Sequence, residues 1–256
     1  MSPVGAIFRK ELSSYFVSPV AYVVAFVFLL LTGLLSFLAI ATTSNRSMQL
    51  LRAQGDLPNL NLNEFVFRPV FYNMAVVLLL VVPILTMRLL AEEKKLKTME
   101  LLVTSPVTIT DIVVGKFVAA LTVLAGLLTL SAVAPVALAP FAEFRWPPIL
   151  TGYMGVLLMG GLFLSAGLLG SSLTENQIIA VILSFGALLL FWLFGWAGQV
   201  FDGTALGKVL SYLSPLDHFE QLVKGLVETK DLVYFIAGIV FTLFLTHRVI
   251  ESQRWR

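Results

Sequence analysis

The chain has 256 residues, of which 58% are hydrophobic and only 12% are charged. About one-quarter of the residues of a soluble globular domain are charged, so this composition excludes a soluble domain and indicates an integral membrane protein. The net charge of +2 is too small to argue for a nucleic-acid partner, and the absence of cysteine excludes disulfides and thiolate metal sites.

The first segment, residues 2–18, comes before any apolar run that is long enough to cross a membrane. Its apolar side chains fall on one face of a helix, and they are Ile7, Phe8, Leu12, Tyr15 and Phe16. We therefore expect an amphipathic helix that lies in the cytoplasmic interface of the membrane. The pattern leaves open whether this helix only anchors the chain or also takes part in energy coupling.

Six apolar runs follow, and each approaches the roughly 20 residues that cross a bilayer. They cover about 20–41, 70–87, 117–137, 149–173, 178–198 and 232–246. The first run is longer than the 7–15 residues, roughly, of a signal-peptide core, so we interpret it as a retained span. The fourth run holds six glycines, which favours close helix packing in lipid and predicts an internal helix. The sequence thus predicts an all-α membrane protein with one transmembrane domain over residues 1–256.

The basic residues predict the orientation of this domain. With both termini inside, ten Lys and Arg residues lie on the inner side and seven on the outer side. The excess follows the positive-inside rule. We therefore expect a multi-pass protein of the cytoplasmic (inner) membrane with both termini in the cytoplasm. Residues 42–69 are then an external loop, for which a short helix at the end is one interpretation.

The stretch Arg88–Lys116, between the second and third runs, carries five basic and four acidic residues. Its first part, 88–104, lacks Gly and Pro, so we expect a helix there. Leu96, Met99 and Val103 would form one apolar stripe on that helix. A solvated loop with ordinary charge pairs is the alternative interpretation.

A proline and a hydroxyl residue mark the end of this helix and the start of the next one. Ser105-Pro106 should end the first helix, because the residue before Pro is forced out of the α region. Thr108 or Thr110 should then cap a new helix that begins near Asp111. The stretch is thus predicted to place a short helix at the face of the membrane.

Several short motifs in this stretch match a known pattern. They are Glu92-Glu93, Thr98-Met99-Glu100-Leu101-Leu102, Thr104-Ser105-Pro106-Val107 and Gly115-Lys116. Together they resemble the cytoplasmic loop of type-2 ABC transporter permeases, although Lys97 stands where many members have Gly and Met99 where many have Leu. The resemblance covers the whole chain and is greatest to the gliding-motility permease group.

The resemblance implies that the loop contains the coupling helix, which docks on a separate ABC ATPase subunit. It assigns this coupling to Glu92, Glu93, Thr98, Glu100, Leu101, Leu102, Thr104 and Pro106. It implies that ATP and Mg²⁺ bind the ATPase and that this chain holds no cofactor. It also implies a second permease half, which is a copy or a related chain, in the same lipid bilayer, and it leaves room for an accessory membrane protein. The direction would be export, and the substrate stays open.

Residues 200–231 form the second informative stretch. Ser214, Pro215 and Asp217 are typical of the first turn of a helix. The apolar face of that helix would consist of Leu216, Phe219, Leu222, Val223 and Leu226. We expect a short external helix that rests on the membrane or dips into it, as in the family. His218 is expected on the surface of this helix rather than as a ligand.

The residues that other mechanisms would need are missing from the sequence. The six runs contain no Asp, Glu, Lys, Arg or His, which argues against ion-coupled transport, although sites built from backbone carbonyls remain open. The closest phosphate-loop string, 203–209, has three residues between its glycines and Val in place of Ser or Thr. Energy for transport should therefore enter from another subunit. A secondary transporter, a channel and a non-transporting scaffold are the alternatives.

Overall fold

The computed structural model describes residues 2–52, 61–98 and 107–253. The regular elements in these ranges are helical, and in chain order they are α1 (Pro3–Val17), α2 (Pro19–Arg52), the π-helical η1 (Asn63–Phe67), α3 (Arg68–Thr86), α4 (Ala91–Lys95), α6 (Ile109–Ser131), α7 (Val133–Leu138), α8 (Trp146–Ser172), α9 (Gln177–Val200), α10 (Ala205–Leu213), α11 (Pro215–Val223) and α12 (Thr229–Gln253).

Six of the helical segments are long and apolar enough to cross a membrane, and they coincide with the six predicted runs. They cover Pro19–Gln49, Asn63–Lys95, Ile109–Leu138, Trp146–Ser172, Gln177–Val200 and Thr229–Ser252. The prediction of an all-α fold with six spans is confirmed. The expected loop at residues 42–52 is wrong, because α2 continues to Arg52. These residues contain neither Gly nor Pro, so nothing in them stops the helix.

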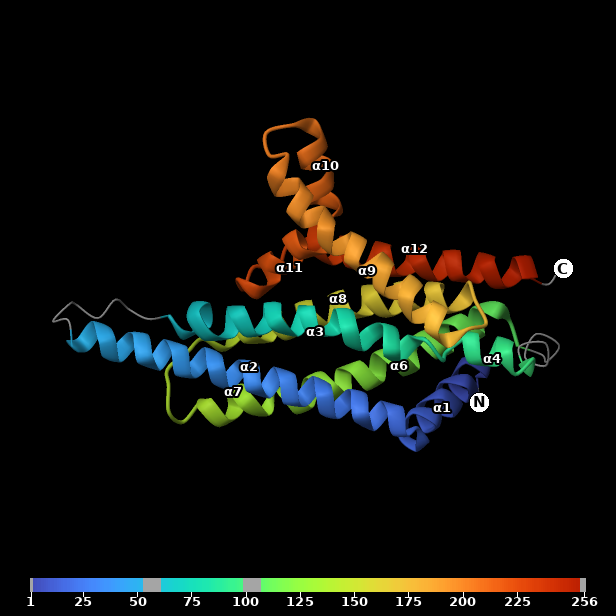
Figure 1. The fold of residues 1–256 in the computed structure, drawn as a ribbon, viewed down its shortest axis with the longest axis horizontal. Coiled ribbons are helices and arrows are strands. Elements are labelled where there is room, and N and C mark those ends of the chain that lie inside the picture. The colour runs from blue at the N-terminus through green and yellow to red at the C-terminus, as the bar shows by residue number, and fades with distance from the viewer. Residues whose placement is uncertain (1, 53–60, 99–106, 254–256) are drawn as a thin grey trace.

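The long helices run side by side along the molecule (Figure 1). Both chain termini and α4 lie at one end of the bundle, which we call the terminal end. The start of α3 and α7 lie toward the opposite end, which we call the far end. Two shorter helices depart from this arrangement, since α10 projects from the bundle beyond the end of α9 and α11 crosses between α10 and α8.

The centre of the bundle is α8, as its glycines predict. Of its most apolar window 78% is buried, and it packs on α3, α6, α9, α11 and α12. A Cβ atom at Gly152 would lie 2.3 Å from the ring of Phe71 in α3. The glycine therefore leaves the room that the ring of Phe71 occupies against α8.

The third span breaks one residue after Ser131, where α6 ends and α7 begins after Ala132. Pro135 lies in α7 and has no N–H to donate to the carbonyl of Ser131, so the helical hydrogen-bond ladder stops there. The interruption therefore falls ahead of Pro135, at Ala132.

The predicted helix after Ser214 is α11, and its buried residues include Pro215, Phe219, Leu222 and Val223. Two details of the prediction are wrong. The hydroxyl of Ser214 makes no capping bond, because its oxygen lies near Gly195 of α9, buried and without a hydrogen-bond partner in the described part of the chain. Leu226 is 53% exposed, because α11 ends at Val223 and a positive φ at Gly225 turns the chain away.

The expected surface position of His218 is also wrong, because its side chain is buried between α10 and α12. Its Nδ1 atom lies 2.6 Å from a carboxylate oxygen of Asp231, and Nε2 lies 3.0 Å from the carbonyl oxygen of Tyr212. The imidazole stacks on Tyr234 with ring centroids 4.0 Å apart. Asp217, the predicted first-turn acid, is partly exposed, and burial raises its pKa above the usual value. The buried histidine thus joins α10, α11 and α12.

Candidate functional site

The predicted coupling stretch is where the structure departs most from the sequence prediction. Instead of one helix over 88–104, the chain turns at 87–90, α4 spans only Ala91–Lys95, and Lys97 has a positive φ of 56°. Leu96 of the predicted apolar stripe is 63% exposed. The remaining predicted positions lie outside the described residues, and they are Met99, Glu100, Leu101, Leu102, Val103, Thr104, Ser105 and Pro106.

The turn between α3 and α4 is held by the last residues of α8. The hydroxyl of Ser171 accepts hydrogen bonds from the backbone N–H groups of Leu90 and Ala91, at 3.1 and 3.0 Å, and donates to the carbonyl of Met87 at 3.1 Å. The ammonium of Lys94 donates to the carbonyl of Ser172. One serine thus satisfies two of the N–H groups that the start of α4 leaves without a partner in the helix, so it fixes where α4 begins. The helix then ends at Lys95, ahead of the positive φ at Lys97.

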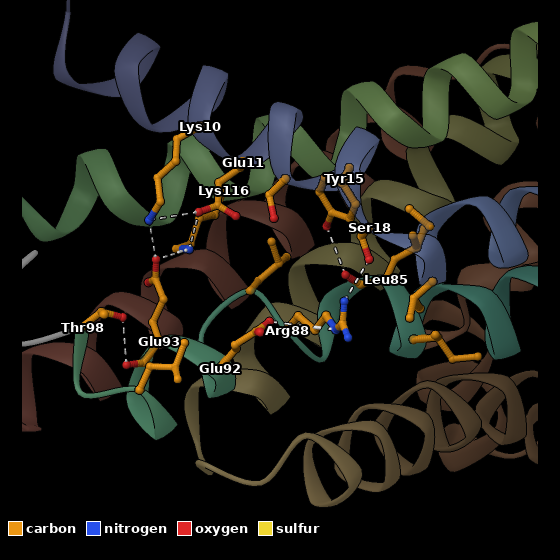
Figure 2. A pocket seen from close by; sticks show the side chains of 16 residues that line it. Lys10, Glu11, Tyr15, Ser18, Leu85, Arg88, Glu92, Glu93, Thr98 and Lys116 are labelled. Atoms are coloured by element: carbon orange, nitrogen blue, oxygen red, sulfur yellow. Dashed lines mark hydrogen bonds and ion pairs between the residues drawn. The ribbon is translucent and has the colours of Figure 1, made fainter.

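Four charged side chains meet beside α4, and we call them the ion cluster: Lys10, Glu11, Glu93 and Lys116. The ammonium of Lys116 lies 2.7 Å from Glu11 Oε1 and 3.0 Å from Glu93 Oε1. Lys10 also reaches Glu93 Oε1, at 3.1 Å. Figure 2 shows these groups pointing toward one another from α1, α4 and α6. The ion cluster therefore links three segments that are distant in sequence.

Burial makes the ion cluster energetically demanding. Lys116 is 1% exposed, Glu93 7% and Glu11 8%. Ions removed from water cost several kcal/mol each, roughly, unless close partners compensate for the lost hydration. The ammonium of Lys116 meets this need by bridging two carboxylates, so the three segments are held in one arrangement.

Two local features bring Lys116 into this position. Thr108 caps α6 through a capping box, in which its hydroxyl accepts from the N–H of Asp111 and the Asp111 carboxylate accepts from the N–H of Thr108. This confirms the predicted cap at Thr108. Farther along α6, Gly115 lets α1 approach closely, since a Cβ there would lie 2.9 Å from Ile7 Cγ2. The side chain of Glu11 consequently faces Lys116.

A second set of contacts ties α1 to the end of α3. The hydroxyl of Tyr15 donates to the carbonyl of Leu85 at 3.0 Å, and Arg88 Nη1 donates to Ser18 Oγ at 2.9 Å. Burial, together with the nearby charge of Glu11, raises the pKa of Tyr15 above its ordinary value, so its hydroxyl keeps its proton. These contacts and the ion cluster surround a cavity of about 310 Å³.

The structure brings some of the predicted coupling residues together with others to which the sequence analysis assigned no coupling role. Glu93 joins the ion cluster, and Thr98 closes the following turn by donating to the Glu93 carbonyl at 3.2 Å. Glu92 is partly exposed and lies 3.9 Å from Arg88 Nε. The roles of Glu11 and Lys116 were missed, although each gave a signal. Glu11 is the only acid in residues 2–18, and Lys116 directly precedes an apolar run.

Comparison with known proteins places this arrangement in a family. No curated protein in the comparison matches the chain. The family model described as "ABC-2 family transporter protein" matches residues 5–249 and so covers nearly the whole chain, from α1 into α12. Its members are membrane transport components that generally lack ATPase activity and normally work with an ABC ATPase subunit. With its six apolar helices, the chain therefore belongs to the ABC-2 family of transporter proteins and is a multi-pass ABC transporter permease.

Proposed function

We propose that this permease is one half of the pathway of an ABC exporter and that a separate ATPase docks on residues 88–116. The observation that carries the proposal is the ion cluster. It connects α4, within the predicted docking stretch, to α1 and to the third span α6 through Lys116. A displacement of α4 would therefore act on both helices, because a buried ion pair resists separation.

The orientation of the chain supports this proposal. Both termini and α4 lie at the terminal end of the bundle (Figure 1), as six spans require. The excess of basic residues on this side favours a cytoplasmic location at the inner membrane. In this proposal Glu92 and the predicted positions from Glu100 to Pro106 contact the ATPase. Glu93 and Thr98 do not contact the ATPase but hold α4 and the turn after it in place. ATP and Mg²⁺ bind the ATPase.

A second half would complete the pathway. The most apolar windows of α2, α9 and α12 are each only 22% buried within the chain. Such faces suit lipid or a second permease chain, and we propose that both cover them. The motifs of residues 88–116 resemble those of the gliding-motility permease group, and we propose that the chain belongs with that group.

The docking role is tested with Leu101→Ala combined with Leu102→Ala. Truncating a central apolar anchor of an interface often costs about 2 kcal/mol, or roughly 30-fold in affinity. We expect the purified double variant to remain folded. It should either release the ATPase subunit or no longer show substrate-stimulated ATP hydrolysis. The matched control is Leu206→Ala with Val209→Ala, two exposed residues of α10. If the folded Leu101/Leu102 variant retains the ATPase subunit and hydrolyses ATP as the wild type does, these leucines have no coupling role.

A further inference from the structure

The contact between His218 and Asp231 has no part in the proposed function, because it lies far along the chain from the coupling stretch. His218 belongs to α11, which packs against both α10 and α12, and Asp231 lies in the first turn of α12. His218 is 6% exposed and Asp231 is fully buried. Two titratable groups thus meet away from water, where the number of protons that they hold determines whether the contact is stable.

Both ring nitrogens of His218 face oxygen atoms that accept hydrogen bonds. The backbone carbonyl of Tyr212, 3.0 Å from Nε2, has no hydrogen to donate, so Nε2 carries a proton. The contact of 2.6 Å between Nδ1 and Asp231 Oδ1 then needs a second proton, because a bare nitrogen and a carboxylate would set two lone pairs against each other. Whichever group carries that proton, the pair holds one proton more than a neutral histidine beside a carboxylate.

Loss of the extra proton would leave one negative charge inside the protein. The second carboxylate oxygen, Asp231 Oδ2, is buried and has no hydrogen-bond partner in the described part of the chain. The carboxylate therefore has no second contact that could stabilise the charge. Because an uncompensated buried charge is far less favourable than a hydrated one, we expect the pair to separate when the proton leaves.

Other titratable groups face His218 from the helices that hold it. Tyr212 of α10 and Tyr234 of α12 lie against its ring, with centroids 5.5 and 4.0 Å away, and Asp217 of α11 acts on it through its charge. Burial raises the pKa of Asp217 above its usual value, yet a carboxyl group is neutral or negative at any pH. None of these three groups can therefore supply a positive charge.

The remaining helices that pack on α11 add no compensating cation either. The sequence of α9 has no titratable residue, and α8 has only Tyr153, whose ring packs on α3. The nearby lysines have other surroundings, since Lys208 is exposed and Lys224 and Lys230 each pair with a glutamate. Within the described part of the chain, the shared proton is therefore what keeps the buried pair neutral.

We propose that His218 and Asp231 form a proton-dependent latch. While the shared proton is bound, the latch holds α10 and α11 against the start of α12, and when the proton leaves, the two helices are released. With both termini in the cytoplasm, α10 and α11 lie on the outer side, so the latch responds to the pH outside the cell membrane. This inference concerns the permease alone and does not depend on the proposed ATPase coupling.

The extra proton determines the sign of the pH dependence. In an unfolded chain, aspartate and histidine ordinarily have pKa values of about 3.9 and 6.5. Between these values the unfolded chain also holds one proton on the two residues, so their contribution to stability is level. Above about pH 6.5 only the folded pair keeps that proton, and stability falls as the pH rises. A difference of one proton changes the unfolding equilibrium constant about tenfold per pH unit.

The first test compares the wild type with Asp231→Asn. The amide of an asparagine can donate an N–H to Nδ1 of a neutral imidazole, so this variant keeps the hydrogen bond without the extra proton. Unfolding equilibrium constants of purified permease in detergent are measured from pH 7 to 9. We expect the ratio of the wild-type constant to the variant constant to rise about tenfold per pH unit until the latch opens. His247→Gln, which changes the other histidine of the chain, should give a constant ratio.

The second test follows the release of the helices with a buried thiol. Ser214, between α10 and α11, is fully buried, and the chain has no cysteine, so a thiol reagent reaches Ser214→Cys only when these helices move. Its labelling rate is divided by that of Lys208→Cys, an exposed position in α10, because thiol reactivity itself depends on pH. We expect this quotient to rise about tenfold per pH unit above neutral pH, and to rise much less when Asp231→Asn is added.

Two results would overturn the latch. A stability ratio between the wild type and Asp231→Asn that stays constant from pH 7 to 9 would show that the pair holds no extra proton. A labelling quotient with the same pH dependence in both backgrounds would show that the pair does not control the release of the helices. If Asp231→Asn does not fold, a level labelling quotient in the otherwise wild-type chain still contradicts the proposal. If Ser214→Cys does not fold, the stability ratio decides.

Discussion

At the residue scale, Lys116 determines how the terminal end is assembled. It is the most buried charged side chain of the ion cluster, and its ammonium bridges Glu11 and Glu93. Lys10 contacts the same carboxylate of Glu93, yet its side chain is 61% exposed. The two lysines therefore make similar contacts in very different surroundings, and solvent screening should make their contributions differ.

Replacing each lysine by methionine tests this difference. Lys116→Met leaves two buried carboxylates without their shared cation, and breaking such a buried pair costs about 3–5 kcal/mol. Lys10→Met removes a screened surface contact and should cost less than about 1 kcal/mol. Both are measured as shifts in the denaturation midpoint of purified permease in detergent. Similar losses from the two variants would contradict a special role for Lys116.

At the element scale, α11 is fastened to the start of α3 by one carboxylate. Glu220 lies 2.6 Å from Arg68 and 2.8 Å from Lys224. The hydrogen bond from Lys224, with the charges of Lys224 and Arg68, lowers the pKa of Glu220 below its ordinary value of 4.5. A lowered folded-state pKa means that the ionised form stabilises the fold.

Because the pKa of Glu220 is lowered in the folded state, the stability that this carboxylate contributes depends on pH. The stabilisation is fully present above about pH 4.5 and is lost as the pH falls through the lower folded-state pKa. We expect Glu220→Gln to lower stability at pH 7 by less than about 1 kcal/mol, because the pair is only half-buried. The difference from the wild type should shrink below pH 4.5. Unfolding midpoints of both proteins from pH 3 to 7 measure this difference in stability. A difference that stays constant over this range would show that the ionised Glu220 does not stabilise the fold.

At the scale of the whole molecule, six spans bring the termini and α4 to one end. Because the chain has no cysteine, single cysteines can report which end faces the cytoplasm. Lys95→Cys lies at the terminal end, and Glu143→Cys lies between α7 and α8 toward the far end; both positions are exposed. In intact cells an impermeant thiol reagent should label only Glu143→Cys. Labelling of Lys95→Cys before lysis would contradict the predicted topology, because it would place the terminal end outside the cytoplasm.

The features that the sequence determined by itself are those encoded by residues close to one another in the chain. Hydropathy alone located the six spans, since any window of about 20 apolar residues favours the bilayer over water. The capping box at Thr108 and the packed position of α8 were also predictable, because a hydroxyl three residues before an acid and a row of glycines are local patterns.

Only the tertiary structure decided which distant side chains meet. Residues 88–104 have helical propensity, yet α4 begins only at Ala91, where Ser171 of α8 accepts from the N–H groups of Leu90 and Ala91, and it ends at Lys95, ahead of the positive φ at Lys97. Glu11 and Lys116 are 105 residues apart, and His218 pairs with an aspartate 13 residues away on another helix. Local preference is worth tenths of a kcal/mol per residue, roughly, whereas an uncompensated buried charge costs several. Packing therefore decided the ion cluster and its cavity, which no periodicity along the chain encodes.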